Sequence, residues 1–212
     1  MRSTYLLLPL LAGLAATDAA LAQSYAIKAG AILYQPHSRT DGVRGIGIPP
    51  GADIDVGSAT TAMLIGEIQF TPNTSVELVL GVPPRVQAKG TGTVAFLGDD
   101  VLSAKNVAPT LLFNYTFGEP GQKLRPYIGA GVNYTRFAGI RSRLAPEVSM
   151  TDSVGPVVQA GLSLQLAPNW GLFTSVARLE VKSDVVAVAS TVLRTTVDFR
   201  PVTYSLGTWY RF

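Results

Sequence analysis

The only histidine of the chain, His37, is followed directly by Ser38 and shortly afterwards by Asp41. A serine activated by a histidine, which is in turn oriented by a carboxylate, is the arrangement that enzymes use for acyl transfer and hydrolysis. Such an arrangement works only when rigid elements hold the three side chains within hydrogen-bond reach. All three residues fall in one predicted loop, so we expect that the protein is not an enzyme and that His37 is a solvated loop residue.

The remaining composition excludes several other kinds of chemistry. The 212 residues include no cysteine, which excludes disulfides, a cysteine nucleophile and a thiolate zinc site. One histidine is too few for a two-histidine metal motif, and the chain has no glycine-rich phosphate loop, so we expect no metal and no cofactor. The formal net charge of +3 comes without a run of lysines or arginines, so we expect no nucleic-acid partner.

The first 22 residues have the pattern of a secretory signal. Arg2 supplies a positive charge, residues 5–16 are largely apolar, and residues 20–22 read Ala-Leu-Ala, an A-x-A cleavage site. The alternative is an uncleaved membrane anchor, but an apolar stretch of 12 residues is shorter than the roughly 20 that a spanning helix needs. We therefore expect export from the cytoplasm, removal of residues 1–22 and a single domain over residues 23–212.

Beyond Gln23 the dominant pattern is an alternation of apolar and polar residues. No run of 18 apolar residues occurs there, which excludes helical membrane spans. Strict alternation is typical of β-strands that have one apolar face. Eight segments show it: 25–33, 61–70, 75–82, 110–117, 128–135, 158–166, 173–182 and 202–212.

Two all-β architectures can accommodate eight such strands. A water-soluble sandwich buries the apolar faces between its two sheets, whereas a transmembrane barrel turns them outward toward lipid. Glycine weakens a strand and has no purpose on a solvent-exposed face, but it relieves crowding inside a narrow barrel. The polar faces carry several glycines, which favour the barrel: Gly30, Gly81, Gly129, Gly131, Gly161 and Gly207.

The connections between the segments alternate in length. The short ones, which are rich in turn residues, are 71–74, 118–124 and 167–169. The long ones are 35–59, 83–105, 138–153 and 183–199. Short turns at one end and long loops at the other are typical of outer-membrane barrels. We therefore predict an all-β fold, an eight-stranded antiparallel transmembrane β-barrel with short periplasmic turns and long extracellular loops.

The last predicted strand ends on an aromatic residue. Phe212 is the final residue, and Tyr204, Leu206 and Tyr210 precede it at even spacing. This ending resembles the signal that the barrel-assembly machinery of Gram-negative bacteria reads, although an ordinary last strand can also end on phenylalanine by chance. Together with the export signal, Tyr210 and Phe212 predict assembly into the bacterial outer membrane, with outer-membrane lipid and the barrel-assembly machinery as partners.

Several stretches resemble the OmpW family of small outer-membrane barrels. Residues 125–135, RPYIGAGVNYT, are close to the RPYxGAGxNYT of the family's fifth strand, and residues 107–117, VAPTLLFNYTF, resemble its fourth-strand LPPTLxxxYxF. The shorter matches are the VEL of residues 76–78, the QAG of residues 159–161, and Asn169-Trp170. The resemblance covers nearly all of residues 23–212.

This resemblance implies a barrel with a narrow and rather hydrophobic lumen. Members of the family are thought to admit small hydrophobic compounds, and some serve as receptors for phages or bacteriocins. We therefore expect a channel that admits small hydrophobic solutes by passive diffusion, with a non-transporting structural or receptor barrel as the alternative. The chain departs from the family at Tyr25, where tryptophan is frequent, and at Pro83-Pro84, where Pro-Phe is usual.

The inward faces of the predicted strands are not uniformly polar. Several apolar or aromatic residues fall on them: Ile32, Tyr34, Met63, Ile65, Val79, Leu112, Val157, Leu172, Val176 and Trp209. These residues either fill a closed core, because eight strands leave little free space, or line a cavity through which an apolar solute passes before leaving sideways. On the same faces, Arg178, Glu180 and Lys182 could pair with Glu67 and Glu77 across the interior.

Overall fold

The computed structural model describes residues 23–36, 38–40, 51–98, 101–143, 147–188 and 192–212. The predicted signal at 1–22, His37 and Asp41 lie outside these described residues. Within them, no helix has the length and apolar character needed to cross a membrane.

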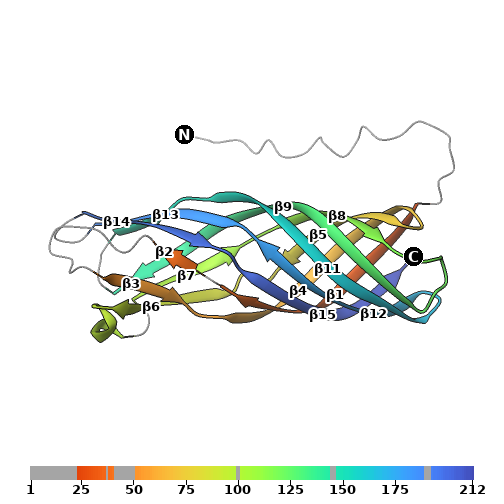
Figure 1. The fold of residues 1–212 in the computed structure, drawn as a ribbon, viewed down its shortest axis with the longest axis horizontal. Coiled ribbons are helices and arrows are strands. Elements are labelled where there is room, and N and C mark those ends of the chain that lie inside the picture. Colours follow the sequence, from red (N-terminus) through yellow and green to blue (C-terminus); the bar gives the residue numbers. More distant parts are fainter. Residues whose placement is uncertain (1–22, 37, 41–50, 99–100, 144–146, 189–191) are drawn as a thin grey trace, which may run out of the picture.

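Eight strands form the wall of a closed barrel (Figure 1). Every neighbouring pair is antiparallel, and the pairing of β9 with β11 closes the ring. The predicted barrel is thereby confirmed. The eight strands are β1 (Ser24–Gln35), β4 (Ala59–Thr71), β5 (Thr74–Gly81), β8 (Thr110–Thr116), β9 (Leu124–Ser142), β11 (Ser153–Ala167), β12 (Trp170–Leu179) and β15 (Val202–Arg211).

The outer surface of the ring carries an apolar band. Outward-facing side chains such as Leu206 (64% exposed), Val158 (55%) and Phe113 (54%) have no protein neighbours to cover them. A water-soluble sandwich would bury these faces, whereas a barrel in lipid exposes them to acyl chains. Exposed aromatic residues lie near the strand ends, where they border the apolar band: Tyr25, Phe70, Trp170, Tyr204, Tyr210 and Phe212.

The three tight connections β4–β5, β8–β9 and β11–β12 lie at one end of the barrel, together with the C-terminus (Figure 1). Asn73 in the first of these turns donates from Nδ2 to the carbonyl oxygens of Thr116 (2.7 Å) and Gly118 (3.0 Å) of a neighbouring connection. Arg125 donates to the carbonyls of Pro72 and Gly118 at the same end. These bonds tie separate turns together, because each satisfies a backbone carbonyl that no strand partner reaches.

At the opposite end the strands continue well beyond the apolar band. The long connections, which the sequence assigns to loops, contain two further sheets and the short 3₁₀ helix η1 (Ala95–Leu97). The strands of the first sheet, which also uses the end of β9, are β3 (Ala52–Val56), β6 (Arg85–Gly92) and β7 (Leu102–Val107). The strands of the second are β2 (Ser38–Thr40), β10 (Glu147–Met150), β13 (Val181–Val188) and β14 (Val192–Phe199).

The prediction for β12 and β13 had the wrong face pointing outward. Phe173, Leu179 and Val181 are buried inside the barrel (2%, 7% and 3% exposed), whereas Arg178 and Glu180 are exposed outside. Lys182 is also exposed outside, so none of these three charges pairs with Glu67 or Glu77. The reason is that β12 is apolar on both faces within the band, so the alternation does not show which face points inward. Its outer face becomes charged only at Arg178, beyond the band.

Inward glycines make room for large side chains inside the ring. A Cβ on Gly129 of β9 would collide with the amide oxygen of Asn114, and one on Gly161 of β11 would collide with the ring and hydroxyl of Tyr127. An eight-stranded barrel is only just wide enough for its side chains. These two glycines therefore let Asn114 and Tyr127 lie across the interior rather than against the wall.

Candidate functional site

The interior contains an apolar chamber toward the long-loop end. This cavity of about 100 Å³ is bounded mainly by side chains of β1, β4, β5, β11 and β12 and by the end of β8. Its apolar lining includes Ile32, Tyr34, Met63, Ile65, Val79, Leu112, Val157, Ala177 and Leu179. Its polar lining includes hydroxyls of Thr61, Thr110, Ser175, Thr203 and Ser205 and amides of Asn106, Asn133 and Gln159.

The structure places seven of the ten residues that the sequence selects for the lumen around this chamber: Ile32, Tyr34, Met63, Ile65, Val79, Leu112 and Val157. Met63 and Ile65 alternate on β4, and Leu112 and Val157 come from β8 and β11. Leu112 and Val157 are almost fully buried, at 3% and 2% exposed. The chamber therefore has walls from strands that are distant in sequence but brought together by closure of the ring.

The other three predicted residues lie elsewhere. Trp209 is inside but below the chamber, where its indole Nε1 donates to the carbonyl oxygen of Leu172 at 3.2 Å. Leu172 and Val176 are on the outer surface, at 36% and 41% exposed, so their assignment to the lumen is wrong. The error has the same origin as the inverted face of β12, because Val176 shares the outward face with Trp170 and Leu172.

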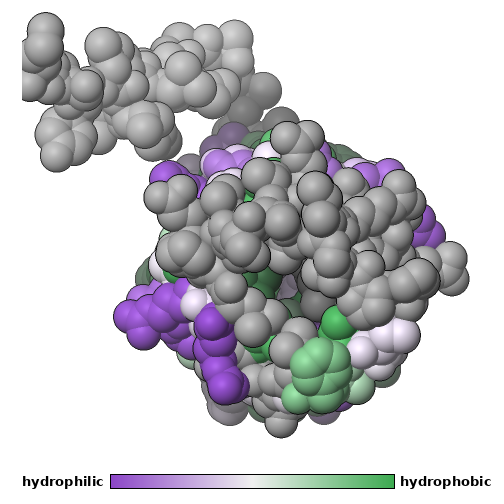
Figure 2. Space-filling view, turned by 90° about the vertical axis from the view of Figure 1, so that its left-hand side faces the viewer, coloured by the Kyte–Doolittle hydropathy of each residue, from purple (hydrophilic) through white to green (hydrophobic). Residues whose placement is uncertain are grey.

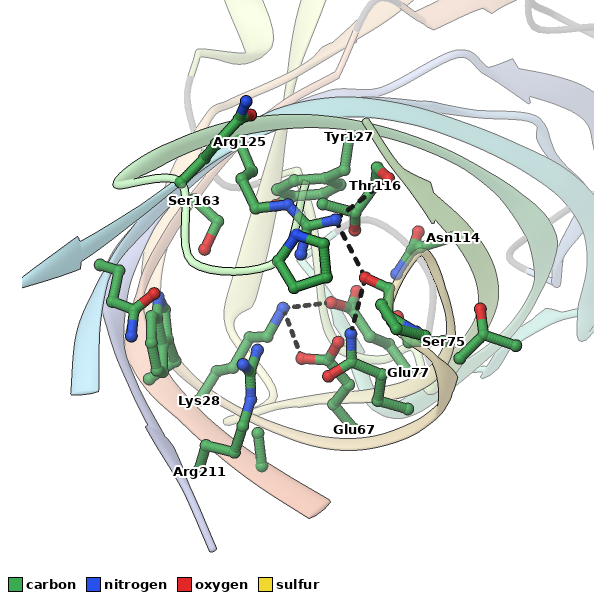
Figure 3. A pocket seen from close by; sticks show the side chains of 18 of the residues that line it. Lys28, Glu67, Ser75, Glu77, Asn114, Thr116, Arg125, Tyr127, Ser163 and Arg211 are labelled. Carbon is green, nitrogen blue, oxygen red and sulfur yellow. Dashed lines mark hydrogen bonds and ion pairs between the residues drawn. The ribbon is translucent and has the colours of Figure 1, made fainter. Parts of the chain in front are cut away.

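A charged layer lies beneath the chamber. Lys28 of β1 points at Glu67 and Glu77, which are paired directly opposite each other on β4 and β5 (Figure 3). Lys28 Nζ lies 2.9 Å from Glu67 Oε2 and donates a short hydrogen bond to Glu77 Oε1. The three side chains are 8%, 11% and 3% exposed. One cation is thus shared by two close carboxylates, and its attraction to both offsets their mutual repulsion.

Amide side chains extend this layer across the lumen. Gln159 Nε2 of β11 donates to Glu77 Oε2 (3.2 Å) and to Asn114 Oδ1 (2.7 Å), while Asn114 Nδ2 has no hydrogen-bond partner among the described residues. Lys28 Nζ also lies 5.5 Å from the ring centroids of Tyr127 and of Phe173, which is within cation–π range. We define the charged layer as Lys28, Glu67, Glu77, Asn114 and Gln159.

Below the charged layer a wider, polar funnel opens at the short-turn end. Its volume is about 480 Å³, and residues of the β4–β5 and β8–β9 turns form its mouth. Arg125 and Arg211 project into it, and Arg211 lies over the ring of Trp209 at 5.1 Å (Figure 3). The lumen is therefore apolar toward the long loops and polar toward the short turns, with the charged layer between them.

Above the chamber, the apolar lining continues into the extended sheets. Leu112, Val157 and Leu179 belong to one buried cluster with Phe137 of β9 and Val181 of β13. Viewed from the long-loop end, apolar surface is visible toward the centre of the molecule (Figure 2). Apolar side chains therefore continue from the extended sheets down to the charged layer.

The wall beside the chamber is interrupted by prolines. The paired register of β5 with β8 stops at Val79–Thr110 and resumes between β6 and β7 at Arg85–Lys105. Pro83, Pro84 and Pro109 fall in the interval, and proline has no N–H to donate to a ladder. Both Pro84 and Ala108 line the chamber. The cavity thus reaches a part of the wall where the strand ladder is interrupted and where Asn106 N donates to Pro84 O at 3.0 Å.

Sequence reasoning placed Glu67 and Glu77 inside the barrel but missed Lys28 as their partner, although a signal for the pairing exists. Glu67 and Glu77 stand at nearly equal distances from the 71–74 turn, which puts them opposite each other in an antiparallel hairpin. Two inward carboxylates at that position require a cation. In the described part of the chain, no three histidine, aspartate or glutamate side chains are grouped so as to hold a metal ion.

Known proteins share both the sequence and the fold. Outer membrane protein W of Vibrio cholerae is 27% identical over 198 residues, covering 89% of this chain and 88% of that protein. The crystal structure of OprG from Pseudomonas aeruginosa superposes with a TM-score of 0.82 at 24% identity, over 89% of this chain and 95% of that one.

A third relative is known by the operon that encodes it. The dibenzothiophene metabolism operon protein PahQ of Pseudomonas aeruginosa is 30% identical over 111 residues, which cover 52% of this chain and 51% of that protein. The family model named OmpW matches residues 22–212. This outer-membrane β-barrel protein therefore belongs to the OmpW family.

Proposed function

We propose that the protein is a passive channel that admits small hydrophobic molecules through the outer membrane. The observation that carries this proposal is the apolar chamber, which extends the apolar interior of the loop end down to the charged layer. A water-filled pore has a polar lumen, whereas this one offers an apolar solute an environment better than water.

The size of the chamber limits the solutes that it can hold. At about 100 Å³ it is smaller than the roughly 300–1,000 Å³ of typical ligand sites. An engineered apolar cavity of about 150 Å³ binds benzene. The chamber therefore suits a slender or flat solute, such as an alkyl chain or naphthalene, that moves through it with its long axis along the barrel.

The charged layer argues against passage straight into the periplasm. To pass it, an apolar solute would have to separate Lys28 from Glu67 and Glu77 and leave buried charges without partners, which costs several kcal/mol. The wall beside the chamber at Pro84 and Ala108 has no such barrier. We propose that the solute leaves sideways there, into the acyl chains of the membrane.

The name of one relative supports the solute class. PahQ is named as a protein of an operon for the metabolism of dibenzothiophene, a sulfur-containing aromatic compound. Uptake down a concentration gradient needs no energy source, because an apolar solute is more soluble in the acyl chains than in water. The barrier that it must bypass is the charged outer surface of the membrane.

The alternative is a barrel that serves as a structural element or receptor and transports nothing. The observation in its favour is the narrowness of the chamber, which a closed core also explains. The two functions differ in one measurable property, the rate at which an apolar solute crosses a membrane that contains the protein.

The test uses vesicles whose outer leaflet is lipopolysaccharide, because a simple phospholipid bilayer lets apolar solutes pass unaided. We expect that the wild-type protein accelerates uptake of radiolabelled naphthalene. Leu112→Asn should abolish the acceleration, because it places an amide in the chamber, whereas Leu112→Met, which keeps volume and polarity, should retain it. If naphthalene entered vesicles with the wild-type protein no faster than protein-free vesicles, transport would be excluded, and the structural or receptor function would remain.

A further inference from the structure

The outer surface changes from apolar to cationic where the band ends on the long-loop side. On β9 the outward residues run from Leu124 to Tyr134, and the next one is Arg136. Beyond β5 the last exposed apolar residue is Val82, and the next exposed side chain on β6 is Arg85. The cations therefore begin at the level where acyl chains give way to lipid headgroups.

The sheet formed by β6, β7 and the end of β9 brings several cations together on this outer face. Arg85 is paired directly opposite Lys105, and Ser103, two residues before Lys105, is paired with Arg141. Gly139, with φ of 57°, accompanies a shift in register between β7 and β9, and such a bulge re-aims the residues that follow it. Like charges placed opposite each other on a sheet are destabilising, so this arrangement favours a bound anion.

These cations surround a pocket. Its volume is about 390 Å³, and we call it the cation pocket, lined by Arg85, Gln87, Ser103, Arg141, Ser142 and Arg143. The side chain of Ser103 lies at its base and is only 5% exposed, with Arg85 Nη1 donating to Ser103 Oγ at 3.4 Å. No carboxylate is among the described residues that line it.

A nearby lysine has the acidic partner that the pocket lacks among its described lining residues. Lys89, on the same strand as Arg85, has its Nζ 3.6 Å from Asp55 Oδ2 of β3. Among the described residues no carboxylate forms an ion pair with Arg85, whose guanidinium instead donates to Ser103 beside the cavity. Guanidinium groups present paired donors in a plane that matches the oxygens of a phosphate.

We propose that the cation pocket binds a phosphate group of lipopolysaccharide in the outer leaflet around the barrel. The pocket faces sideways from the wall, and its Arg85 lies three residues, or ~10 Å along a strand, beyond Val82 at the edge of the apolar band. Figure 2 shows hydrophilic side chains gathered on one flank of this end. At that height and orientation, the anions that a guanidinium meets are the phosphates of lipid headgroups. This site is independent of the apolar chamber and of the proposed transport.

The test is the binding of fluorescent deep-rough lipopolysaccharide to the purified barrel in detergent, with EDTA present so that divalent cations cannot bridge anions. We expect that Arg85→Gln with Arg141→Gln weakens binding by about tenfold or more, because charge-assisted hydrogen bonds to phosphate are lost. The matched control, Lys89→Gln with Lys123→Gln, removes two exposed cations elsewhere and should bind within about twofold of wild type.

Two further arms identify the ligand. Enzymatically dephosphorylated lipopolysaccharide should bind the wild-type protein as weakly as the intact lipid binds the double arginine variant. Inorganic phosphate at millimolar concentration should not displace the lipid. Any of three results would overturn the proposal. The double arginine variant could bind the lipid as tightly as the double lysine variant, the wild-type protein could bind the dephosphorylated lipid as tightly as the intact one, or free phosphate could displace the lipid. Different gel mobility before and after boiling verifies that every variant is folded.

Discussion

Lys28 Nζ on β1 lies 2.9 Å from Glu67 Oε2 on the neighbouring strand β4, in the layer that closes the apolar chamber from below. Glu67 is itself paired opposite Glu77, so the lysine is shared between two buried carboxylates. This contact separates the two halves of the lumen, and it makes the layer depend on a single cation.

Replacing that cation should destabilise the barrel. Lys28→Met leaves two buried carboxylates without a counter-charge, so we expect the free energy of unfolding to fall by about 3–5 kcal/mol. The measurement is reversible urea unfolding in lipid vesicles. Adding Glu67→Gln and Glu77→Gln to Lys28→Met removes the uncompensated charge, so the triple variant should recover most of the loss. A single variant as stable as wild type would show that the ion pairs contribute nothing.

The prolines beside the chamber should control the sideways exit. Replacing both Pro84 and Pro109 with alanine supplies two N–H donors where the ladder between the strands is interrupted, so we expect a tighter wall and severalfold slower uptake of naphthalene. Pro120→Ala, in a turn at the other end, is the control and should leave uptake unchanged. Undiminished uptake by the double variant would exclude this exit.

The C-terminal aromatic residue should act during assembly. Phe212 is 69% exposed, and its ring lies 5.1 Å from that of Tyr210, edge to face. Because Phe212 packs on little else, we expect Phe212→Ala to lower the amount of folded protein in the outer membrane of cells while refolding into detergent stays normal. Phe117→Ala, at another exposed aromatic of the band, is the matched control. Equal loss in both variants would argue against a terminal assembly signal.

The membrane-embedded part of the fold could be predicted from the sequence because lipid imposes a strict pattern. Leu111 and Phe113 must face acyl chains, and Leu112 between them must face inward, so alternation alone fixes the orientation of β8. On β12 the inward residues Phe173 and Leu179 are as apolar as the outward Leu172 and Val176. There the pattern has no preferred face, and the prediction inverted the strand.

The extended sheets and the charged layer required the structure. Beyond the band both strand faces meet water or other loops, so β6, β7, β13 and β14 lack the clean alternation that lipid imposes. That Lys28 faces inward follows from alternation, but its contact with Glu67 and Glu77 depends on how far the strands are staggered when the ring closes. Stagger is a property of the whole barrel and cannot be predicted from one strand.

The measurement that tests the account most directly compares two adjacent positions on β11. Val157 points into the chamber and is 2% exposed, whereas Val158 points toward lipid and is 55% exposed. The chain has no cysteine, so a single introduced cysteine can be modified alone. Each of Val157→Cys and Val158→Cys is treated in the folded state with a charged methanethiosulfonate reagent, and complete modification is verified by mass.

Naphthalene uptake is then measured in vesicles with a lipopolysaccharide outer leaflet. We expect modification at position 157 to reduce uptake to the level of protein-free vesicles, because a charge now occupies the apolar chamber, and modification at position 158 to leave it intact. Undiminished uptake with a fully modified cysteine at position 157 would contradict the account, because the solute would then not pass through the chamber.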